Sequence, residues 1–276
     1  PVLAAAALLR IPSLIWEGNQ VPGRSVRLSG RMATLRTVTF SGAAAALPQP
    51  TLVTGTPIRG LSGLGRDAAC RRLGLPSDVP AMLVFGGSQE VKRFNAAVSE
   101  ALADIVERCA VVHITGAGGI AAAEADRAGL PVERQARYRP FSFLDEDMSA
   151  ALASARIVVG RAGSSTLAEC AAAGVPLVVV PYPHAAAHQR ANAAELVEAG
   201  AAVLVDDEDF DGDTLRDACD LLYDTHRLGS MSARARAVGR PSSAAASAEL
   251  LLRLAANEPL PTQSEIDALS GAGAGA

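Results

Sequence analysis

The chain has 276 residues, of which 49% are hydrophobic and 20% are charged, and its formal net charge is −4. These values are typical of a soluble globular protein with room for one large or two modest α/β domains. No apolar run reaches the roughly 18 residues of a membrane-spanning helix, and residues 2–9 lack the charged leader of a signal peptide. We therefore expect no spanning segment. No nucleic-acid partner is expected either.

The four cysteines are spread along the chain and form no C-x-x-C pair. They are Cys70, Cys109, Cys170 and Cys219. This spacing argues against a metal cluster and against a disulfide framework, so we expect a reducing, cytosolic environment without metal or cofactor. The acidic run 145–147 indicates a solvated loop before a helix rather than a metal site.

Positive charge is concentrated near the beginning of the chain, where residues 1–60 hold six arginines against Glu17 alone. An anionic partner, either a phosphate-bearing substrate or a membrane surface, is one explanation, and an ordinary solvated arginine face is the other. Arg24, Arg27 and Arg31 recur at helical spacing. They are therefore predicted to lie on one face of a helix over residues 24–32.

The first segment is predicted to alternate between short helices and strands. The pattern favours a helix over residues 1–9, strands over 13–16, 37–40 and 51–53, and a loop over 18–23. A glycine-rich stretch over residues 55–65 predicts an interdomain linker.

The residues after this linker alternate regularly between strand and helix patterns. Strands are predicted over residues 81–85, 110–114, 131–137, 157–159, 177–180 and 202–205. Helices are predicted over residues 91–105, 148–153, 165–173, 186–199, 213–223, 226–238 and 242–255. This alternation indicates a parallel, doubly wound sheet with right-handed crossovers. Residues 257–276, which end in Gly-Ala repeats, are predicted to be disordered.

A glycine turn, Gly86-Gly87-Ser88-Gln89, follows a predicted strand and opens a helix. Glycines let a phosphate approach the backbone, while the Ser88 hydroxyl and the helix dipole favour its negative charge. Tight strand-to-helix turns also use glycine for geometry alone, so this signal is weak by itself. The turn is not a P-loop, because no Gly-Lys-Ser/Thr follows. It does not match the dinucleotide-binding fingerprint either, because Glu90 occupies its next position.

The segment from Gly160 to Glu169 is a stronger signal, because it follows an apolar strand and opens a helix with small hydroxyl residues. Glu169 lies about one turn after Ser165 and is placed to accept two hydrogen bonds from a ribose diol, although it also fits a capping carboxylate. Residues 183–184 and 188–189 follow the next strand and are expected to line the same crevice. The pattern predicts a nucleotide-sugar site, whereas His113, in an apolar setting, is expected to pack in the core.

Together these motifs resemble the MurG family, bacterial transferases that add N-acetylglucosamine to the lipid-linked muramyl-pentapeptide precursor of peptidoglycan. The similarity runs from Pro1 to about Ala255. The matching stretches are residues 16–23 (H-E-Q-N-A-V-P-G in the family), 55–59 (G-N-P-V-R), 86–89 with Asn95 (G-G-S-Q-G and its trailing asparagine), 143–148 (F-I-D-D-M, with one extra residue here), and the donor-site blocks 161–169 and 181–189.

The resemblance implies an α/β glycosyltransferase of the GT-B type, with two Rossmann-like, doubly wound parallel-sheet domains of which the first is incomplete here. Residues 1–57 are expected to be the remainder of the acceptor- and membrane-facing domain, and residues 58–240 the domain that binds UDP-N-acetylglucosamine. Residues 241–256 are expected to cross back to the first domain, ahead of the tail 257–276. The implied reaction is an inverting displacement without metal, at the cytoplasmic face of the cell membrane.

The resemblance also implies a role for individual residues. Asn19 and Gln189 are expected to contact the sugar, Arg59 and Ser88 the diphosphate, Leu144 the uracil and Glu169 the ribose hydroxyls. The full substrate-binding set is Asn19, Arg59, Ser88, Leu144, Arg161, Ser164, Ser165, Thr166, Leu167, Ala168, Glu169, His188 and Gln189. Arg24, Arg27 and Arg31 are expected to meet an anionic membrane surface or the pyrophosphate of the lipid-linked muramyl-pentapeptide acceptor.

The chain departs from the family pattern at Trp16, Gly18, Val26 and Glu90, where the family has histidine, glutamine, asparagine and glycine. The family's first glycine-rich loop, with the histidine proposed as general base, is expected upstream of Pro1, so the chain is expected to be N-terminally truncated and no catalytic residue is assigned within it. Two alternatives stay open: a related UDP-sugar transferase with another lipid or small-molecule acceptor, and an inactive UDP-sugar-binding protein.

Overall fold

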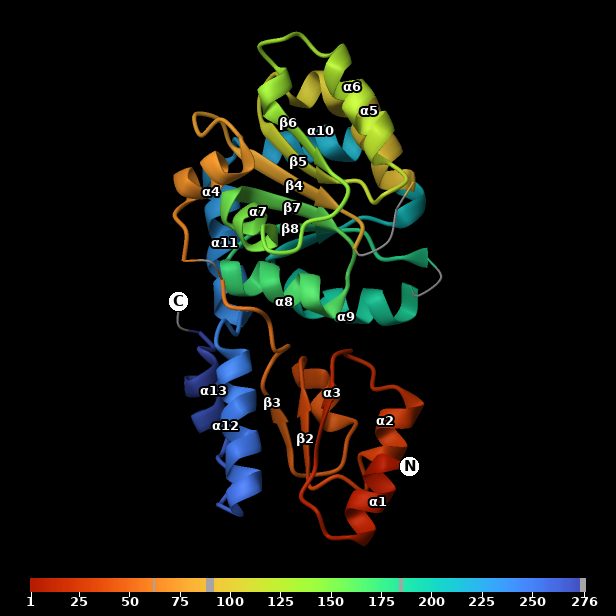
Figure 1. Cartoon of the computed structure of the whole chain (residues 1–276), viewed down its shortest axis with the longest axis vertical. Helices are drawn as coiled ribbons and strands as arrows, with labels where there is room; N and C mark the ends of the chain where they lie inside the picture. The colour runs from red at the N-terminus through yellow and green to blue at the C-terminus, as the bar shows by residue number, and fades with distance from the viewer. Residues whose placement is uncertain (62, 88–91, 184–185, 274–276) are drawn as a thin grey trace.

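The computed structural model describes residues 1–61, 63–87, 92–183 and 186–273. Its elements form two parallel α/β units that are stacked along the long axis of the molecule, the smaller at the bottom of Figure 1 and the larger at the top. Each unit has its own sheet, and the chain passes from the smaller to the larger unit after β3 (Thr51–Val53).

The smaller unit is built on a three-stranded parallel sheet in the order β1-β2-β3. Its elements are α1 (Val2–Leu8), β1 (Leu14–Glu17), α2 (Arg24–Ser29), β2 (Leu35–Val38), α3 (Ser41–Ala45) and β3. The central strand β2 is buried along its whole length. Helices α12 (Ser243–Ala256) and α13 (Gln263–Ser270), from the other end of the sequence, pack beside β3, and Leu250 and Ile266 share an apolar cluster with Leu35 and Leu52.

The larger unit holds a six-stranded, entirely parallel sheet in the order β6-β5-β4-β7-β8-β9. Its strands are β4 (Ala81–Phe85), β5 (Ala110–Ile114), β6 (Tyr138–Phe141), β7 (Ala155–Gly160), β8 (Leu177–Val179) and β9 (Ala202–Leu204). Its helices are α4 (Arg66–Leu73), α5 (Lys92–Ile105), α6 (Ile120–Gly129), α7 (Met148–Ser154), α8 (Ser164–Ala173), α9 (Ala186–Glu198), α10 (Gly212–Leu221) and α11 (Thr225–Val238), with 3-10 turns η1 (Gln135–Arg137) and η3 (Asp207–Asp209). This is the doubly wound order, with its switch point between β4 and β7.

Strands of the larger sheet are apolar on both sides because helices cover both faces of the sheet. Along β4, Leu83 and Phe85 pack into one hydrophobic cluster, while Met82 and Val84 pack into the cluster on the opposite face. His113 is 1% exposed, as expected for a core residue, and burial lowers its pKa to about 3. The imidazole is therefore neutral at physiological pH.

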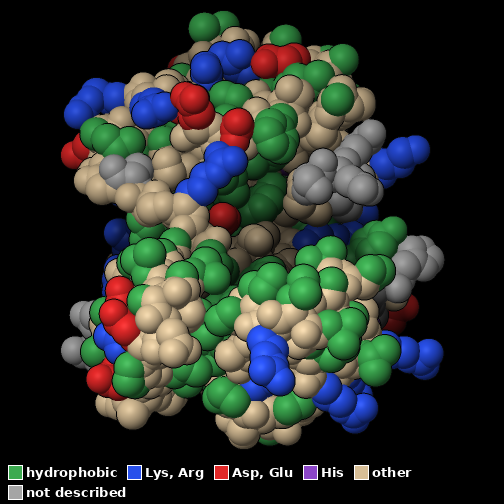
Figure 2. All heavy atoms as spheres, turned by 60° about the horizontal axis from the view of Figure 1, so that its bottom comes forward, with side chains coloured by type: hydrophobic (Ala, Val, Ile, Leu, Met, Phe, Trp, Pro, Cys, Tyr) green, Lys and Arg blue, Asp and Glu red, His purple; other side chains and the backbone are tan. Residues whose placement is uncertain are grey.

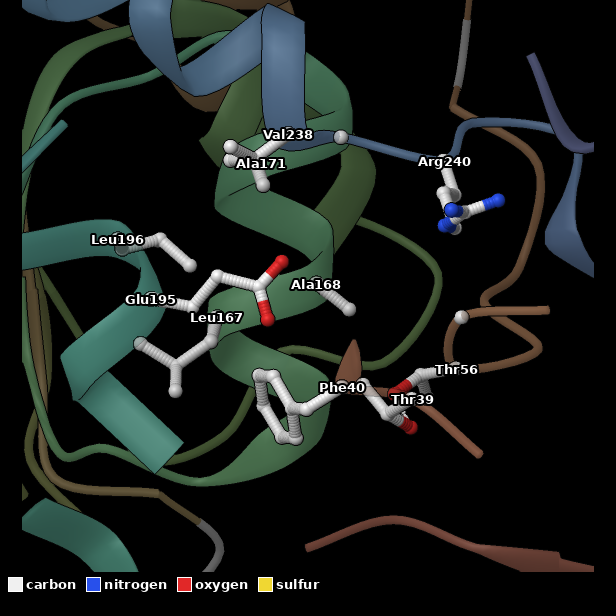
Figure 3. A pocket seen from close by; sticks show the side chains of 12 residues that line it. Thr39, Phe40, Thr56, Leu167, Ala168, Ala171, Glu195, Leu196, Val238 and Arg240 are labelled. Atoms are coloured by element: carbon white, nitrogen blue, oxygen red, sulfur yellow. Dashed lines mark hydrogen bonds between the residues drawn. The ribbon is translucent and has the colours of Figure 1, made fainter. Parts of the chain in front are cut away.

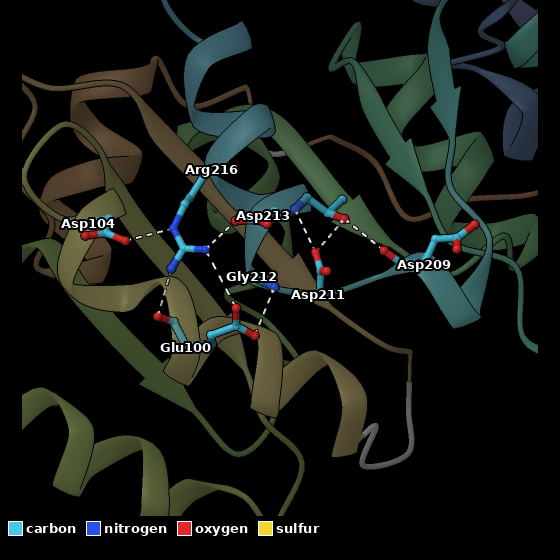
Figure 4. Close-up of polar contacts among 8 residues, drawn as sticks. Glu100, Asp104, Asp209, Asp211, Gly212, Asp213 and Arg216 are labelled. Atoms are coloured by element: carbon cyan, nitrogen blue, oxygen red, sulfur yellow. Dashed lines mark hydrogen bonds and ion pairs between the residues drawn. The ribbon is translucent and has the colours of Figure 1, made fainter.

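Helix α10 is fastened to α5 by a group of polar contacts shown in Figure 4. Arg216 on α10 donates to Asp104 on α5 at 2.7 Å and to Asp213, one turn earlier on its own helix, at 2.6 Å. Asp211 caps α10 by accepting the Thr214 N–H at 3.1 Å. These contacts join two helices that cover the same face of the larger sheet.

The strand predicted over residues 131–137 is wrong. This stretch forms a turn and the 3-10 segment η1, and the strand is β6, which begins at Tyr138. Val132 is 82% exposed, whereas Tyr138 is fully buried and supplies the first inward side chain. Arg137 Nη1 donates to the carbonyls of Val106 and Glu107, which holds the chain just before the strand.

Other differences concern element boundaries. Helix α2 ends at Ser29, so Arg31 lies in the turn beyond it, and β2 covers residues 35–38 because Leu35 is a fully buried residue of the smaller core. Helices α3, α4 and α6 occupy stretches for which the sequence predicts no element. In α6 only Ala123 is buried, so that helix carries little amphipathic signal.

The prediction of a disordered tail over residues 257–276 is wrong for α13. Thr262 and Glu265 form a complete capping box at its start. Ile266 is fully buried, and Gln263 accepts from the Val53 N–H at 2.8 Å and donates to its carbonyl at 3.0 Å. The Gln263 side chain therefore hydrogen bonds to the outer edge of β3, which fixes the helix on the smaller sheet.

Candidate functional site

The carboxyl ends of β4 and β7 lie side by side at the switch point of the larger sheet, where Phe85 pairs with Gly160. Ligands of doubly wound sheets bind in the crevice at this position. The chain leaves β4 through Gly86 and Gly87, and Gly87 has a φ of +98°, a conformation that glycine adopts without a Cβ clash. The predicted anion residue Ser88, with Glu90, lies outside the described residues.

A pocket of about 620 Å³ lies between the linker that follows β3, the start of α7 and one face of α8. It is lined by Pro57, Ile58, Arg59, Gly60, Leu61, Phe143, Leu144, Asp145, Glu146, Met148, Ser149, Leu152, Ser165 and Glu169. Four residues of the predicted substrate-binding set, Arg59, Leu144, Ser165 and Glu169, meet here. Residues separated by more than 100 positions in sequence thus share one cavity of nucleotide size.

Glu169 and Arg59 set the electrostatics of this pocket. Burial raises the pKa of the Glu169 carboxyl, and the positive charge of Arg59 partly opposes that rise. The Arg59 guanidinium donates to Asp145 at 2.7 Å, but both side chains are mostly exposed. An exposed ion pair of this kind contributes little to stability, so Arg59 can exchange Asp145 for an anionic ligand at small cost.

Helix α8 presents different residues of the predicted set to different cavities. Ser165 and Glu169, four positions apart, face the large pocket, whereas Leu167 and Ala168 line a separate cavity of about 30 Å³ between the two units (Figure 3). Leu167 is fully buried. Ser164 and Thr166 are half-buried in the first turn, where Gly163 is the N-cap and no side chain caps the helix. The free N–H groups of this first turn can therefore donate to an anionic ligand at the N-terminus of α8.

Arg161 is held away from the pocket by partners of its own. Its side chain is 6% exposed, forms an ion pair with Asp207 at 2.5 Å, and donates to the carbonyls of Val180 and Pro181 at 3.2 Å each. The guanidinium also lies over the rings of Phe94 and Tyr182, 4.9 and 5.3 Å from their centroids. Arg161 therefore fixes the loop after β8.

The same loop leads to the predicted sugar contacts at the start of α9. Gln189 Oε1 accepts the Tyr182 N–H at 2.8 Å, and His188 is exposed. The predicted crevice residue His184 lies outside the described residues.

On the opposite side of the interface between the two units, Asn19 belongs to the loop that follows β1 in the smaller unit. Its side-chain oxygen accepts from Asn192 Nδ2 on α9 at 3.1 Å, which brings Asn19 against the larger unit. In the same loop, a Cβ built on Gly18 would lie 3.1 Å from Oγ of Ser164. The predicted sugar-contacting loop therefore meets the α8 N-terminus.

Several polar residues of this interface were missed by the sequence analysis, namely Glu17, Asn192 and Glu195. Glu195 points into the small cavity of Figure 3, and burial raises the pKa of its carboxyl. The one signal in the sequence that could have indicated them is spacing, because residues 188, 192 and 195 recur on one helical face.

Arg24, Arg27 and Arg31 are exposed and do not line the pocket. Within the described ranges, no group of three or more histidine, cysteine, aspartate or glutamate side chains is arranged to hold a metal.

Comparisons with known proteins agree with this geometry. Residues 81–247 match the family model of the glycosyltransferase family 28 C-terminal domain. Two relatives are named UDP-N-acetylglucosamine–N-acetylmuramyl-(pentapeptide) pyrophosphoryl-undecaprenol N-acetylglucosamine transferase. The one from Syntrophotalea carbinolica is 40% identical over 87% of this chain and 65% of its own length. The one from Corynebacterium diphtheriae is 36% identical over 93% of this chain and 69% of its own length.

The fold has solved counterparts as well. The crystal structure of MurG from Acinetobacter baumannii is similar over 91% of this chain and 69% of its own, with a TM-score of 0.71 and 29% identity. The calicheamicin glycosyltransferase CalG4 shares the fold, with a TM-score of 0.61 and 19% identity over 92% of this chain and 72% of its own.

The two facing parallel α/β units and the nucleotide-sized pocket at the larger one, together with the family-model match, define a glycosyltransferase of the GT-B type, as the resemblance implies. The chain spans 65 to 70% of the length of the relatives it matches. The chain belongs to the MurG family, the N-acetylglucosamine transferases named above.

Proposed function

We propose that this protein transfers N-acetylglucosamine from UDP-N-acetylglucosamine to a lipid-linked N-acetylmuramyl-pentapeptide, the step named for its relatives. The observation that carries the proposal is the common pocket of Arg59, Leu144, Ser165 and Glu169 at one end of a doubly wound sheet. A pocket that combines an apolar wall, a half-buried carboxylate and an arginine has the groups that a base, a ribose diol and a diphosphate require.

The donor is proposed to lie with its uridine in this pocket and its sugar at the interface between the two units. Leu144 would contact the uracil and Glu169 would accept both ribose hydroxyls, since an ionised carboxylate offers two acceptor oxygens. Arg59 would leave Asp145 for the diphosphate, together with Ser88 and the first turn of α8 over residues 164–166. The sugar would then reach Asn19 and Gln189 at the interface.

The proposed chemistry is a direct displacement with inversion. The oxygen of an acceptor hydroxyl attacks the anomeric carbon, the bond from that carbon to the diphosphate oxygen breaks, and its electron pair leaves with UDP. The hydroxyl proton goes to a general base, for which the family resemblance implies a histidine. Negative charge grows on the leaving diphosphate, so Arg59 and the helix N-termini aimed there would stabilise the transition state more than the ground state.

The smaller unit is proposed to face the anionic inner surface of the cell membrane. Among the described helices, none is both long and apolar enough to cross a membrane. Helices α1 and α2 expose Val2, Leu8 and Leu28, which are 82%, 85% and 65% exposed, beside the exposed arginines 10, 24, 27 and 31. Figure 2 shows hydrophobic and basic side chains together on the smaller unit. Apolar side chains among arginines suit an interfacial contact with anionic lipid.

Radiolabelled transfer tests the proposal. The full-length protein is incubated with labelled UDP-N-acetylglucosamine and a short-chain lipid-linked muramyl-pentapeptide, and label is measured in the lipid fraction, with UDP binding measured separately by calorimetry. Transfer to this acceptor is the expected result. Transfer only to other acceptors would support the related UDP-sugar transferase instead, and UDP binding without transfer to any acceptor would support an inactive binding protein.

A further inference from the structure

Asn192 on α9 connects the two units through a side chain that is 2% exposed. Its Oδ1 accepts the Gln20 N–H at 2.8 Å, and its Nδ2 donates to Asn19 Oδ1 at 3.1 Å and to the Ala162 carbonyl at 3.5 Å. One buried amide therefore contacts the β1 loop of the smaller unit and the segment that enters α8 in the larger unit.

Both ends of this amide are in use, and that determines which side chains can replace it. Aspartate keeps an acceptor for Gln20 but loses the Nδ2 donor, and alanine loses both. Because the group is buried, an unpaired partner on either side is costly. Asn192 thus fixes a particular relative placement of the two units at this point.

Asn19 is held from its own side as well. The Glu17 carboxylate, 5% exposed, accepts from the Asn19 N–H at 2.9 Å and from Asn19 Nδ2 at 3.1 Å. Its other oxygen accepts the Gly23 N–H at 2.9 Å, which closes the loop. The amide of Asn19 is therefore oriented by Glu17 from within the smaller unit and by Asn192 from the larger unit.

We propose that Asn192 is a positioning residue, which orients the Asn19 amide toward the donor sugar only when the two units are in contact. This inference rests on the proposed function, in which Asn19 contacts the sugar while the uridine lies in the pocket of the larger unit. Asn192 then makes recognition of the sugar, but not of UDP, depend on contact between the units. Within the part of the chain that the structure describes, none of the hydrogen bonds of Asn192 involves a residue that lines the pocket of Arg59 and Glu169.

Calorimetry with UDP and with UDP-N-acetylglucosamine separates these effects. Asn192→Ala is expected to leave the Kd for UDP within about twofold and to weaken UDP-N-acetylglucosamine about tenfold, the size of one lost polar contact. Asn19→Ala is expected to show the same sugar-specific loss, and the double variant no further loss, because both act through one amide. Glu198→Ala, an exposed position on the same helix, is the matched control and is expected to change neither Kd.

Trp16, the one tryptophan of the sequence, gives a readout that does not depend on activity. Its ring lies next to Gly18 at this interface, so loosening the units in Asn192→Ala is expected to shift its emission to longer wavelength. Asn192→Asp, which retains the acceptor, provides the same comparison if the alanine variant does not fold. Equal losses for UDP and UDP-N-acetylglucosamine, or additive losses in the double variant, would overturn the inference. Failure of the unaltered protein to bind UDP would instead contradict the proposed function.

Discussion

The indole ring of Trp16 occupies the space that a side chain at Gly18 would need. A Cβ built on Gly18 would lie 2.7 Å from Cη2 of Trp16, a separation that real carbon atoms do not sustain. The ring is held there by a hydrogen bond from Nε1 to the Gly55 carbonyl at 3.2 Å. Trp16 and Gly18, where the resemblance implies histidine and glutamine, are therefore sterically coupled at the end of β1.

This coupling predicts a non-additive pair of substitutions. Gly18→Gln alone is expected to lower the free energy of unfolding by about 1–3 kcal/mol, because the new side chain displaces the indole. The double variant Trp16→His and Gly18→Gln is expected to recover most of that loss. Urea denaturation of the two single variants and the double variant measures the interaction. Effects that add within about 0.5 kcal/mol would show that the two positions are independent.

Donor affinity is predicted to depend on the Glu169 carboxylate. Glu169→Ala is expected to weaken UDP binding by about 1–3 kcal/mol, since two ribose hydroxyls lose their acceptor in a partly buried site. Glu146→Ala is the matched control, because it removes an exposed negative charge from the same pocket without removing the ribose acceptor. Calorimetry is the measurement, and an unchanged Kd in a folded Glu169→Ala protein would disprove the role assigned to this residue.

The pH dependence of donor binding follows from the same group. Burial raises the pKa of Glu169 above its ordinary value of 4.5, with Arg59 acting against that shift. As the pH falls through this raised pKa, the carboxyl takes up a proton and can no longer accept both ribose hydroxyls, so UDP affinity is expected to fall on the acid side of neutrality. The free energy of unfolding changes in the opposite direction. Because the folded protein binds this proton more tightly than the unfolded chain does, the stabilisation that Glu169 gives at low pH is lost as the pH rises through the raised pKa.

Glu169→Gln provides the comparison for this pH effect. UDP titrates through its own terminal phosphate with a pKa of about 6, but that titration is common to both proteins. The difference between the affinity profiles of the parent and the glutamine variant therefore isolates the carboxyl. Parallel profiles from pH 5 to pH 8 would rule out Glu169 as the titrating group.

The sequence predicted those parts of the site that depend on local pattern. The apolar runs placed β4 at its observed bounds, and the four-residue spacing of Ser165 and Glu169 put both on one helical face. It did not predict the partners of Arg161, because Asp207 reaches it only after the chain has passed through two further strands. Asn192 was missed for the same reason, since its bond to Asn19 spans 173 positions and depends on how two units meet.

A comparison of two neighbouring ion pairs tests the structural role of Arg161. Arg161→Ala is expected to lower the free energy of unfolding by about 1–3 kcal/mol, because the mostly buried Asp207 loses its buried partner and keeps only the half-exposed Arg93, at 3.3 Å. The variant also removes the contacts with Phe94 and Tyr182. Arg190→Ala breaks the adjacent but exposed pair with Asp206 and is expected to cost about 1 kcal/mol or less. Similar losses in both variants would show that Arg161 does not hold the loop after β8.

Attachment to anionic lipid is predicted to depend on the arginines of the smaller unit. Replacing Arg24, Arg27 and Arg31 by glutamine is expected to weaken binding to anionic vesicles by about 1 kcal/mol per residue, and binding by the parent protein is expected to fall as salt rises. Sedimentation with vesicles of anionic and of neutral lipid measures both effects.

The matched control for the vesicle experiment removes the same charge from the larger unit, through the exposed Arg71, Arg156 and Arg227. If position rather than net charge governs attachment, this second triple variant binds like the parent protein, because its arginines lie on α4, β7 and α11, away from the exposed apolar side chains of α1 and α2. Equal losses in the two triple variants would mean that net charge alone attracts the protein to lipid. If vesicle binding changes neither with salt nor with the replacement of Arg24, Arg27 and Arg31, these arginines form an ordinary solvated surface.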